Sequence, residues 1–430
     1  MMLTFSKSLH RIPSSILTWV SMVCSASLAT SAIASDLQQQ RKIYDQAQEY
    51  LDNNQVTQYQ KIRNKIKGYP LTPYTDYRAF LVDIGQRSPA EVEAFIDTYS
   101  TLPFSARIRA PYIDSLARQK QWQKLAEFQT VEPRGETYQC HYYHALYQTG
   151  HKDQAFEGAE KLWHSGQSIA DACDPLFEVW DKAGLRTDQQ ILERMLLAFE
   201  ARNGSLMNYL KKQLNSDKTR KQASDMKALF NRPENVVNFA RQHSDSGFNR
   251  SQTGLALKKL ARKDVRMAQR AFDQATSAQK MPQDEAQKLA DYIAFRLINT
   301  DSESLAQWRD KKIETSSNND LIERRVRLAI QEADWRGVED WIGHLPEKKQ
   351  QSLRWQYWLG RSEVALGDIT KGSQRLENLV GQRNFYSVAA AKEIKRSINY
   401  PVSTISFEQQ AVKPFMTALV RIEELIERDK

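Results

Sequence analysis

Short helical hairpins recur along the chain, and this recurrence is the feature that most constrains the fold. In each hairpin an apolar helix ends at a short polar or glycine-containing turn, and a new amphipathic helix follows. A single pair of this kind has an apolar face that it cannot bury alone, so neighbouring pairs must stack on one another. The sequence therefore predicts an all-α fold, an α-solenoid of stacked helical hairpins. The turns lie near Lys120, Gly150, Asp264, Asp334 and Gly367.

The stretch at residues 354–394 shows the pattern most clearly. Trp355 and Trp358 stand at helical spacing on an apolar face. Gly367 interrupts this helix, a second apolar helix follows, and a third begins near Phe385. Because Trp355, Trp358 and Trp335 lie on apolar helical faces, we expect them to belong to the core and not to form platforms for sugars.

The first 34 residues have the pattern of a signal peptide. Lys7 and Arg11 precede a run of apolar and small residues at 16–29, and Ala32 and Ala34 then supply small residues at the two positions that a signal peptidase reads. The run is short for a bilayer span, and a polar, glutamine-rich segment follows at once. We therefore expect residues 1–34 to be removed on export to the periplasm, leaving a mature chain without a transmembrane segment.

The chain is basic, with 61 Lys and Arg against 52 Asp and Glu and a formal charge of +9, or +7 without the two basic residues of the leader. A basic balance favours an anionic partner. Export argues against nucleic acid as that partner. The residues crowded beside one hairpin turn would be either a solvated face or a basic surface for an acidic polymer. The candidates for polymer binding are Lys258, Lys259, Arg262 and Lys263.

Two cysteines, Cys140 and Cys173, remain after loss of the leader, which contains Cys24. An even number of cysteines in an oxidising compartment favours a disulfide. A metal site is the alternative, because histidines such as His141 and His144 lie between the two cysteines. Their spacing matches no compact zinc motif. The sequence thus favours the disulfide, and no metal or other cofactor is predicted.

An ordered set of short segments resembles the soluble lytic murein transglycosylase family of Gram-negative bacteria. The similarity covers most of the chain from about Asp36 onward. It implies a superhelical ring of α-helices at residues 35–398 and the start of a small helical linker domain at residues 399–430. In the family a lysozyme-like catalytic domain comes last. The segments are the Tyr-Pro-Leu-Thr-Pro-Tyr turn at 69–74, Cys-His-Tyr-Tyr at 140–143, Trp-Arg-Gly-Val at 335–338, Arg-Trp-Gln-Tyr-Trp at 354–358 and Asn-Phe-Tyr at 384–386.

The resemblance also implies a catalytic mechanism, and this sequence departs from the family pattern at the catalytic segment. In the family one Glu protonates the glycosidic oxygen and then acts as base, while the 6-hydroxyl of muramic acid attacks and gives an anhydro product. The catalytic segment should contain Glu-Ser and, further on, Gly-Leu-Met-Gln. Here Glu303-Ser304 lies within the helical repeats and no Gly-Leu-Met-Gln occurs. We expect Glu303 to be a surface residue, and no catalytic residue is assigned.

Two functions follow as hypotheses. The first is the scaffold portion of a periplasmic lytic murein transglycosylase, which engages peptidoglycan and works with a catalytic domain or other cell-wall enzymes but does not cleave by itself. The second is a periplasmic helical-repeat adaptor for a protein partner, because repeat surfaces bind peptides as readily as glycans. A free-standing hydrolase is disfavoured, because the sequence contains no GxSxG, no HExxH and no Gly-rich phosphate loop.

Overall fold

The structure is a computed structural model that describes residues 36–398, residue 400 and residues 409–428. All regular elements within these residues are α- or 3₁₀-helices, which confirms the prediction of an all-α fold. Among the same residues, no helix combines the length and the apolar character that crossing a bilayer would require. The predicted signal peptide lies outside the described residues, and so does residue 399, where the linker domain is predicted to begin.

The chain divides into two compact units, and each is described by itself. The first unit comprises residues 1–158, 171–176 and 405–430. A helix at residues 36–52 opens its described part. The further elements of this unit are α2 (Val56–Arg63), η1 (Asn64–Ile66), α3 (Thr72–Val82), η2 (Ile84–Gln86), α4 (Pro89–Thr98), η3 (Ser105–Ile108), α5 (Arg109–Arg118), α6 (Trp122–Phe128), α7 (Glu136–Gln148), η4 (Asp171–Cys173) and α24 (Gln409–Arg428).

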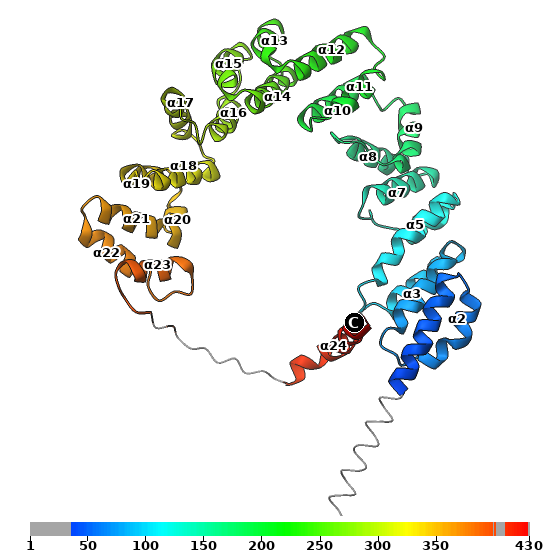
Figure 1. Cartoon of the computed structure of the whole chain (residues 1–430). Helices are drawn as coiled ribbons and strands as arrows, with labels where there is room; N and C mark the ends of the chain where they lie inside the picture. Colours follow the sequence, from blue (N-terminus) through cyan, green and yellow to red (C-terminus); the bar gives the residue numbers. More distant parts are fainter. Residues whose placement is uncertain (1–35, 399, 401–408, 429–430) are drawn as a thin grey trace, which may run out of the picture. The chain divides into compact units, whose positions relative to one another are not determined.

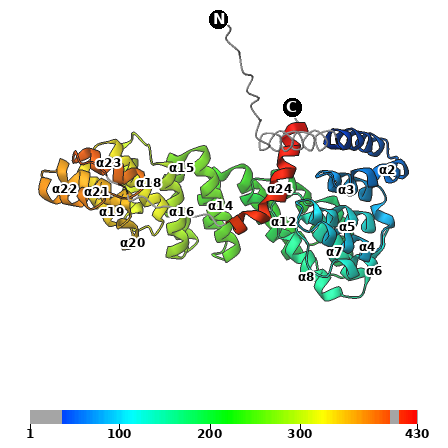
Figure 2. The same ribbon diagram turned by 90° about the horizontal axis from the view of Figure 1, so that it is seen from below.

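The second unit comprises residues 159–170 and 177–404, and two helices contain residues of both units, namely α8 (Lys152–Trp163) and α9 (Asp174–Lys182). Helices α14, α15 and α16 of the second unit lie side by side (Figure 2). The elements of this unit are α10 (Asp188–Glu200), α11 (Gly204–Lys211), α12 (Asp217–Asn231), η5 (Pro233–Asn235), α13 (Val236–Gln242), α14 (Gly247–Lys263), α15 (Val265–Ala278), α16 (Gln283–Arg296), α17 (Glu303–Ile313), α18 (Asn319–Gln331), α19 (Trp335–Gly343), α20 (Glu347–Gln350), α21 (Leu353–Ala365), α22 (Ile369–Glu377) and α23 (Phe385–Glu393).

The predicted hairpin turns separate packed helices, as in the pairs α14–α15, α18–α19 and α21–α22 (Figure 1). An aspartate follows each of these turns and caps the next helix. The carboxylate of Asp264 accepts a hydrogen bond from the amide of residue 267 at 2.9 Å, and those of Asp334 and Asp368 make the equivalent bonds at 3.0 and 3.2 Å. Gly367 has a φ of 100°, a left-handed conformation that glycine adopts without strain. The local sequence thus determines where each hairpin reverses.

Small residues allow α21 and α22 to approach closely. A Cβ atom added to Gly372 on α22 would lie 2.6 Å from the carbonyl oxygen of Gly360 on α21. Beside this contact, Trp355 is only 2% exposed and belongs to the core that α18, α19 and α21 share. Trp358 is partly buried against the same core. The prediction that these tryptophans are core residues is confirmed for Trp355, while Trp358 and Trp335 are partly buried and pack against this core from its edge.

Cys140 and Cys173 form a disulfide between α7 and η4, with their Cα atoms 4.8 Å apart. Both residues are fully buried, and their sulfur atoms are bonded to each other. The neighbouring His144 is buried as well, and its ring packs edge-on against Trp122 at 4.8 Å between centroids. The disulfide predicted from the sequence is therefore confirmed over the alternative in which these cysteines bind metal.

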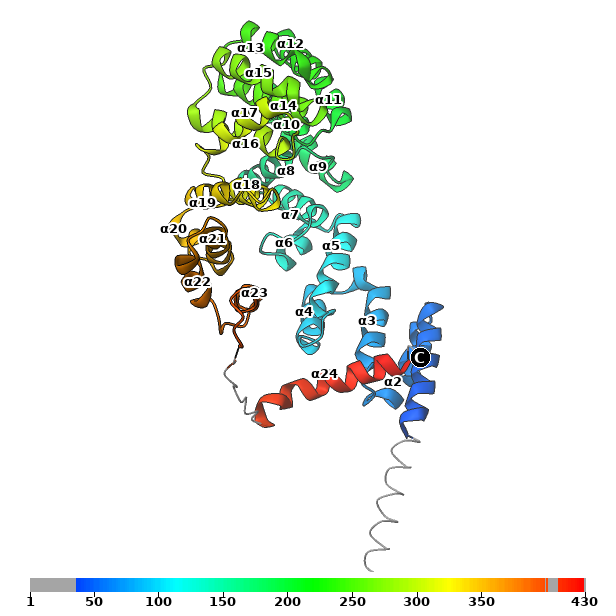
Figure 3. The same cartoon turned by 60° about the vertical axis from the view of Figure 1, so that its left-hand side comes forward.

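The C-terminal half of α24 lies beside the helix at residues 36–52 (Figure 3). Polar side chains join the two helices. Glu424 is 6% exposed and accepts two hydrogen bonds from Arg41, at 2.7 and 2.9 Å, and one from the hydroxyl of Tyr69 at 2.6 Å. The apolar side chains of this half point to solvent, with Ile422 50% and Ile426 55% exposed. Within the first unit, α24 is therefore held by its charged face.

Candidate functional site

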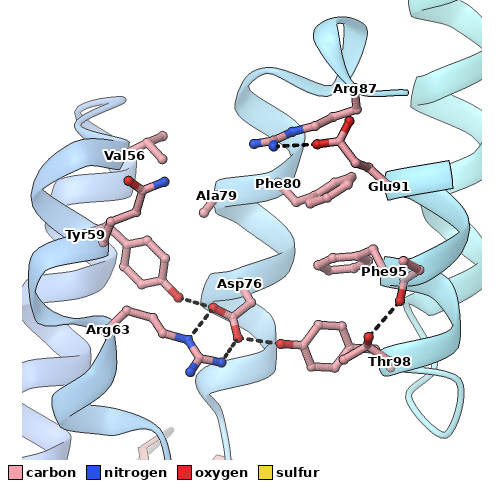
Figure 4. Close-up of a pocket in the computed structure, with 13 residues that line it drawn as sticks. Val56, Tyr59, Arg63, Asp76, Ala79, Phe80, Arg87, Glu91, Phe95 and Thr98 are labelled. Carbon is pink, nitrogen blue, oxygen red and sulfur yellow. Dashed lines mark hydrogen bonds and ion pairs between the residues drawn. The ribbon is translucent and has the colours of Figure 1, made fainter. Parts of the chain in front are cut away.

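A cavity in the first unit lies between α2, α3 and α4 and combines aromatic walls with a network of charged groups (Figure 4). Its volume is about 510 Å³, which is in the range of small-molecule sites. We call it the Asp76 pocket, and define it by its lining residues, Val56, Tyr59, Gln60, Arg63, Asp76, Ala79, Phe80, Arg87, Glu91, Ala94, Phe95, Thr98 and Tyr99.

The carboxylate of Asp76 is the centre of the network. Its Oδ1 accepts hydrogen bonds from the hydroxyl of Tyr59 at 2.5 Å and from Nε of Arg63 at 3.0 Å. Its Oδ2 accepts from Nη2 of Arg63 at 2.7 Å and from the hydroxyl of Tyr99 at 2.5 Å. The side chain of Asp76 is 12% exposed and that of Arg63 is 29% exposed. A bidentate ion pair that is shielded from water in this way holds the side chains of both residues in one orientation.

The network also sets the protonation states. Burial acts to raise the pKa of Asp76, but the hydrogen bonds from Arg63, Tyr59 and Tyr99 outweigh it and hold the pKa below its usual value. Burial, followed by the hydrogen bond to Asp76, raises the pKa of Tyr99 to about 12, and the same two causes raise the pKa of Tyr59. At neutral pH the carboxyl is ionised and both hydroxyls are protonated. The Asp76 pocket is therefore suited to binding and not to general acid catalysis.

Aromatic rings form the wall beside the network. The ring centroids of Phe80 and Phe95 are 4.4 Å apart, and those of Phe95 and Tyr99 are 4.8 Å apart. The guanidinium of Arg87 lies over the ring of Phe80 at 5.0 Å and pairs with Glu91 at 3.3 Å. The pocket thus presents apolar ring surface at one side and fixed polar groups at the other.

Local sequence explains how α3 and α4 present these groups. Asp76, Ala79 and Phe80 stand three and four residues apart on α3, so they share one face of the helix. Helix α4 begins with a capping box, in which Ser88 and Glu91 bond to each other's backbone amides at 2.8 and 3.3 Å. This box fixes the start of α4 at Pro89. It also holds Glu91 at the rim of the pocket.

The four basic candidates lie on α14 of the second unit, in two stripes. Lys258 lines a cavity of about 300 Å³ between α10, α14 and α16, and Arg262 donates to the hydroxyl of Tyr292 at 3.0 Å. Lys259 and Lys263 face the other way. The ammonium of Lys259 lies 3.2 Å from the ring centroid of Phe230, and Lys263 pairs with Glu234 at 3.4 Å.

Burial lowers the pKa of Lys259, and the neighbouring cations lower it further. Lys259 and Lys263 therefore have partners within the protein, on α12 and η5. Of the four candidates, Lys258 borders the cavity, and Arg262, one helical turn further along α14, contacts Tyr292 on α16. Polymer binding by these residues stays a prediction.

Glu303 is exposed at the start of α17, where its carboxylate accepts a hydrogen bond from Gln307 at 3.2 Å. The prediction that it is a surface residue is confirmed. The Asp76 pocket itself was not predicted. Its polar residues are scattered over three helices, and the only sequence signal is the pair Tyr59 and Arg63, four residues apart on one face of α2.

Comparison of the sequence with known proteins gives a consistent result, although no family model matches the chain. It is 34% identical over 373 residues to the soluble lytic murein transglycosylase of Escherichia coli K12, which covers 86% of this chain and 58% of the relative. The enzyme of the same name from Salmonella typhimurium is 33% identical over the same length, with the same coverage. The chain thus spans somewhat more than half the length of these relatives.

Comparison with solved structures gives the same result as comparison of the sequences. The complex of the 70-kDa soluble lytic transglycosylase with bulgecin A has a TM-score of 0.80 at 32% identity and covers 91% of this chain and 63% of that one. The lytic transglycosylase Slt of Pseudomonas aeruginosa, solved as an inactive mutant, has a TM-score of 0.76 at 25% identity, with 90% and 63% covered. The chain is therefore a homologue of the soluble lytic murein transglycosylases, related to them in sequence and in helical fold over somewhat more than half of their length.

Proposed function

We propose that this chain is the scaffold portion of a periplasmic lytic murein transglycosylase that acts on peptidoglycan, and that the chain does not cleave glycan strands by itself. The observation that carries the proposal is the sequence similarity to the Escherichia coli enzyme across 86% of the chain. The sequence supports the second part, because Glu303 is exposed on a repeat helix and no Gly-Leu-Met-Gln segment occurs.

The proposal includes the earlier predictions on compartment and organisation. Residues 1–34 would be removed on export, residues 35–398 would form the scaffold, and residues 399–430 would begin a linker domain. In the family that linker leads to the catalytic domain, which would be the first partner of the scaffold. Peptidoglycan would be the second.

A murein zymogram and a sacculus pull-down with the purified mature chain test this function. We expect the chain to sediment with isolated sacculi and to leave no zone of clearing in the zymogram. Clear lysis would contradict the non-catalytic assignment. Failure to sediment, together with capture of a protein from periplasmic extract, would favour the alternative function, a helical-repeat adaptor.

The stripe of Lys258 and Arg262 is the part of the basic cluster that we propose to face an acidic polymer. Lys258→Glu should weaken sacculus binding several-fold at low salt, and the difference should shrink above about 0.5 M salt as charges are screened. Lys348→Glu, on the short and exposed α20, is the matched control and should bind as the unchanged protein does. Equal binding by both variants would remove this stripe from the proposal.

A further inference from the structure

We propose that the Asp76 pocket binds an uncharged N-acetylated hexosamine residue of a glycan strand. The identity of the sugar rests on the proposed function, because peptidoglycan strands contain such residues. The site itself is argued below from the charges, walls and polar atoms of the pocket.

Charge balance favours a neutral ligand. The lining contains two cations, Arg63 and Arg87, and two carboxylates, Asp76 and Glu91. Each cation is already paired, Arg63 with Asp76 at 2.7 Å and Arg87 with Glu91 at 3.3 Å. An anion would compete with carboxylates that hold both guanidinium groups, and a cation would find both oxygens of Asp76 occupied by donors. The Arg63–Asp76 pair is sheltered from water, and separating it would leave a largely buried charge without its partner, whereas the Arg87–Glu91 pair lies at the exposed rim.

The walls favour a ligand with an apolar face. Phe80, Phe95 and Tyr99 form a continuous run of ring contacts along one side. Val56 and Ala79 continue this apolar lining (Figure 4). A pyranose ring has a face of C–H groups that can cover aromatic surface, and the methyl of an acetamido group matches the aliphatic side chains.

The polar atoms of the pocket complement hydroxyl and amide groups. Arg63 binds Asp76 through Nε and Nη2, so its Nη1 lies outside that pair and can donate to a sugar oxygen. The hydroxyl of the partly buried Tyr99 donates its proton to Asp76, and its oxygen can still accept a hydrogen bond. Tyr59 is 2% exposed and its hydroxyl also contacts that of Thr75 at 3.1 Å, so Tyr59 serves to hold Asp76 in place. The exposed side chain of Gln60 at the rim offers both a donor and an acceptor. Fixed donors and acceptors beside an aromatic wall are what a neutral sugar requires.

Isothermal titration calorimetry of the mature chain with tetra-N-acetylchitotetraose tests the proposal. Ala94→Leu places extra side-chain volume at the rim, where Ala94 is exposed, and Gln60→Ala removes the rim amide. We expect each to weaken binding at least fivefold. Ala90→Leu, also exposed on α4 but outside the lining, should leave binding unchanged. Equal affinity for all four proteins, or no binding at millimolar ligand, would overturn the proposal.

Charged oligosaccharides test the choice of ligand. The deacetylated tetramer is a cation and tetragalacturonate is an anion, and we expect both to bind at least tenfold more weakly than the acetylated sugar. Tighter binding of either, lost in Ala94→Leu, would overturn the neutral ligand. The sacculus pull-down separates this proposal from the proposed function, because sacculi present many other contacts. If the unchanged protein sediments with sacculi but binds no chitotetraose, the pocket proposal alone fails.

Discussion

Replacing Asp76 by Asn should destabilise the first unit, because it removes the charge around which three side chains are arranged. The change keeps the size and shape of the side chain. The carboxylate receives two hydrogen bonds from Arg63 and one each from Tyr59 and Tyr99. An amide keeps one acceptor oxygen, and its NH₂ group would face a guanidinium that also only donates.

The magnitude follows from these contacts. Two hydrogen bonds to a charged group are weakened or lost, each worth about 1.5–3 kcal/mol when buried. Arg63 is 29% exposed, so water recovers part of the loss. We therefore expect Asp76→Asn to lower the free energy of unfolding of the first unit by about 2–4 kcal/mol. Tyr99→Phe, which removes one bond, should cost about 1–2 kcal/mol.

Hydrogen exchange with peptide-level mass spectrometry is the suitable assay, because two compact units need not unfold together and a single global transition would mix them. Peptides from α2, α3 and α4 should lose protection in Asp76→Asn, while peptides from α18 to α22 should not change. Asp97→Asn, exposed on α4 and outside the lining, is the control. A loss below about 0.5 kcal/mol in Asp76→Asn, the size of an ordinary surface substitution, would refute the reasoning.

Further predictions concern pH, the disulfide and two packing contacts. The pKa of Asp76 is depressed in the folded state, so its contribution should be fully present above the unfolded value of about 3.9 and lost as pH falls below it; acid titration of the first unit followed by hydrogen exchange should show a loss that Asp76→Asn lacks. Cys140→Ser opens a link across 33 residues and should cost about 3–4 kcal/mol, measured by urea unfolding beside the reduced parent. Gly372→Ala would put its Cβ 2.6 Å from the backbone of α21 and should cost about 1–3 kcal/mol, whereas Gly343→Ala, with open space around it, should be neutral by the same measurement. Glu424→Gln weakens the contact between α24 and the helix at residues 36–52, so peptides from both segments should exchange faster, and unchanged rates would show that this contact does not hold α24.

Local patterns in the sequence were sufficient for the helices and their turns. The turns near Asp334 and Gly367 were predicted because the apolar helical pattern stops there and starts again, and the structure shows Asp334 and Asp368 capping the helices that follow. Trp355 was predicted as core because apolar periodicity reports which helical face is buried. Each inference concerns residues within about one turn of helix, where spacing alone decides which groups meet.

The Asp76 pocket could not be predicted in this way, because its members meet only through tertiary packing. Tyr59 and Arg63 come from α2, Asp76 from α3 and Tyr99 from the residue after α4. Each residue type is common on helix surfaces, so none of them signals a site by itself. The same limit applies to the basic cluster. Lys258 and Lys259 are adjacent in the sequence of α14, but their side chains contact different neighbouring helices and therefore belong to two stripes.

Helix α24 shows where apolar periodicity misleads. In a surface helix the apolar stripe usually faces the core, and this rule would bury Ile422 and Ile426. In the first unit both are at least half exposed, while Glu424 between them is 6% exposed. The reversal has an electrostatic cause, because Arg41 and the hydroxyl of Tyr69 together offer Glu424 three charge-assisted or short hydrogen bonds. A buried carboxylate needs such donors, so the partner residues, 355 and 383 positions away, determine which face of α24 is inward, and the pattern within the helix does not.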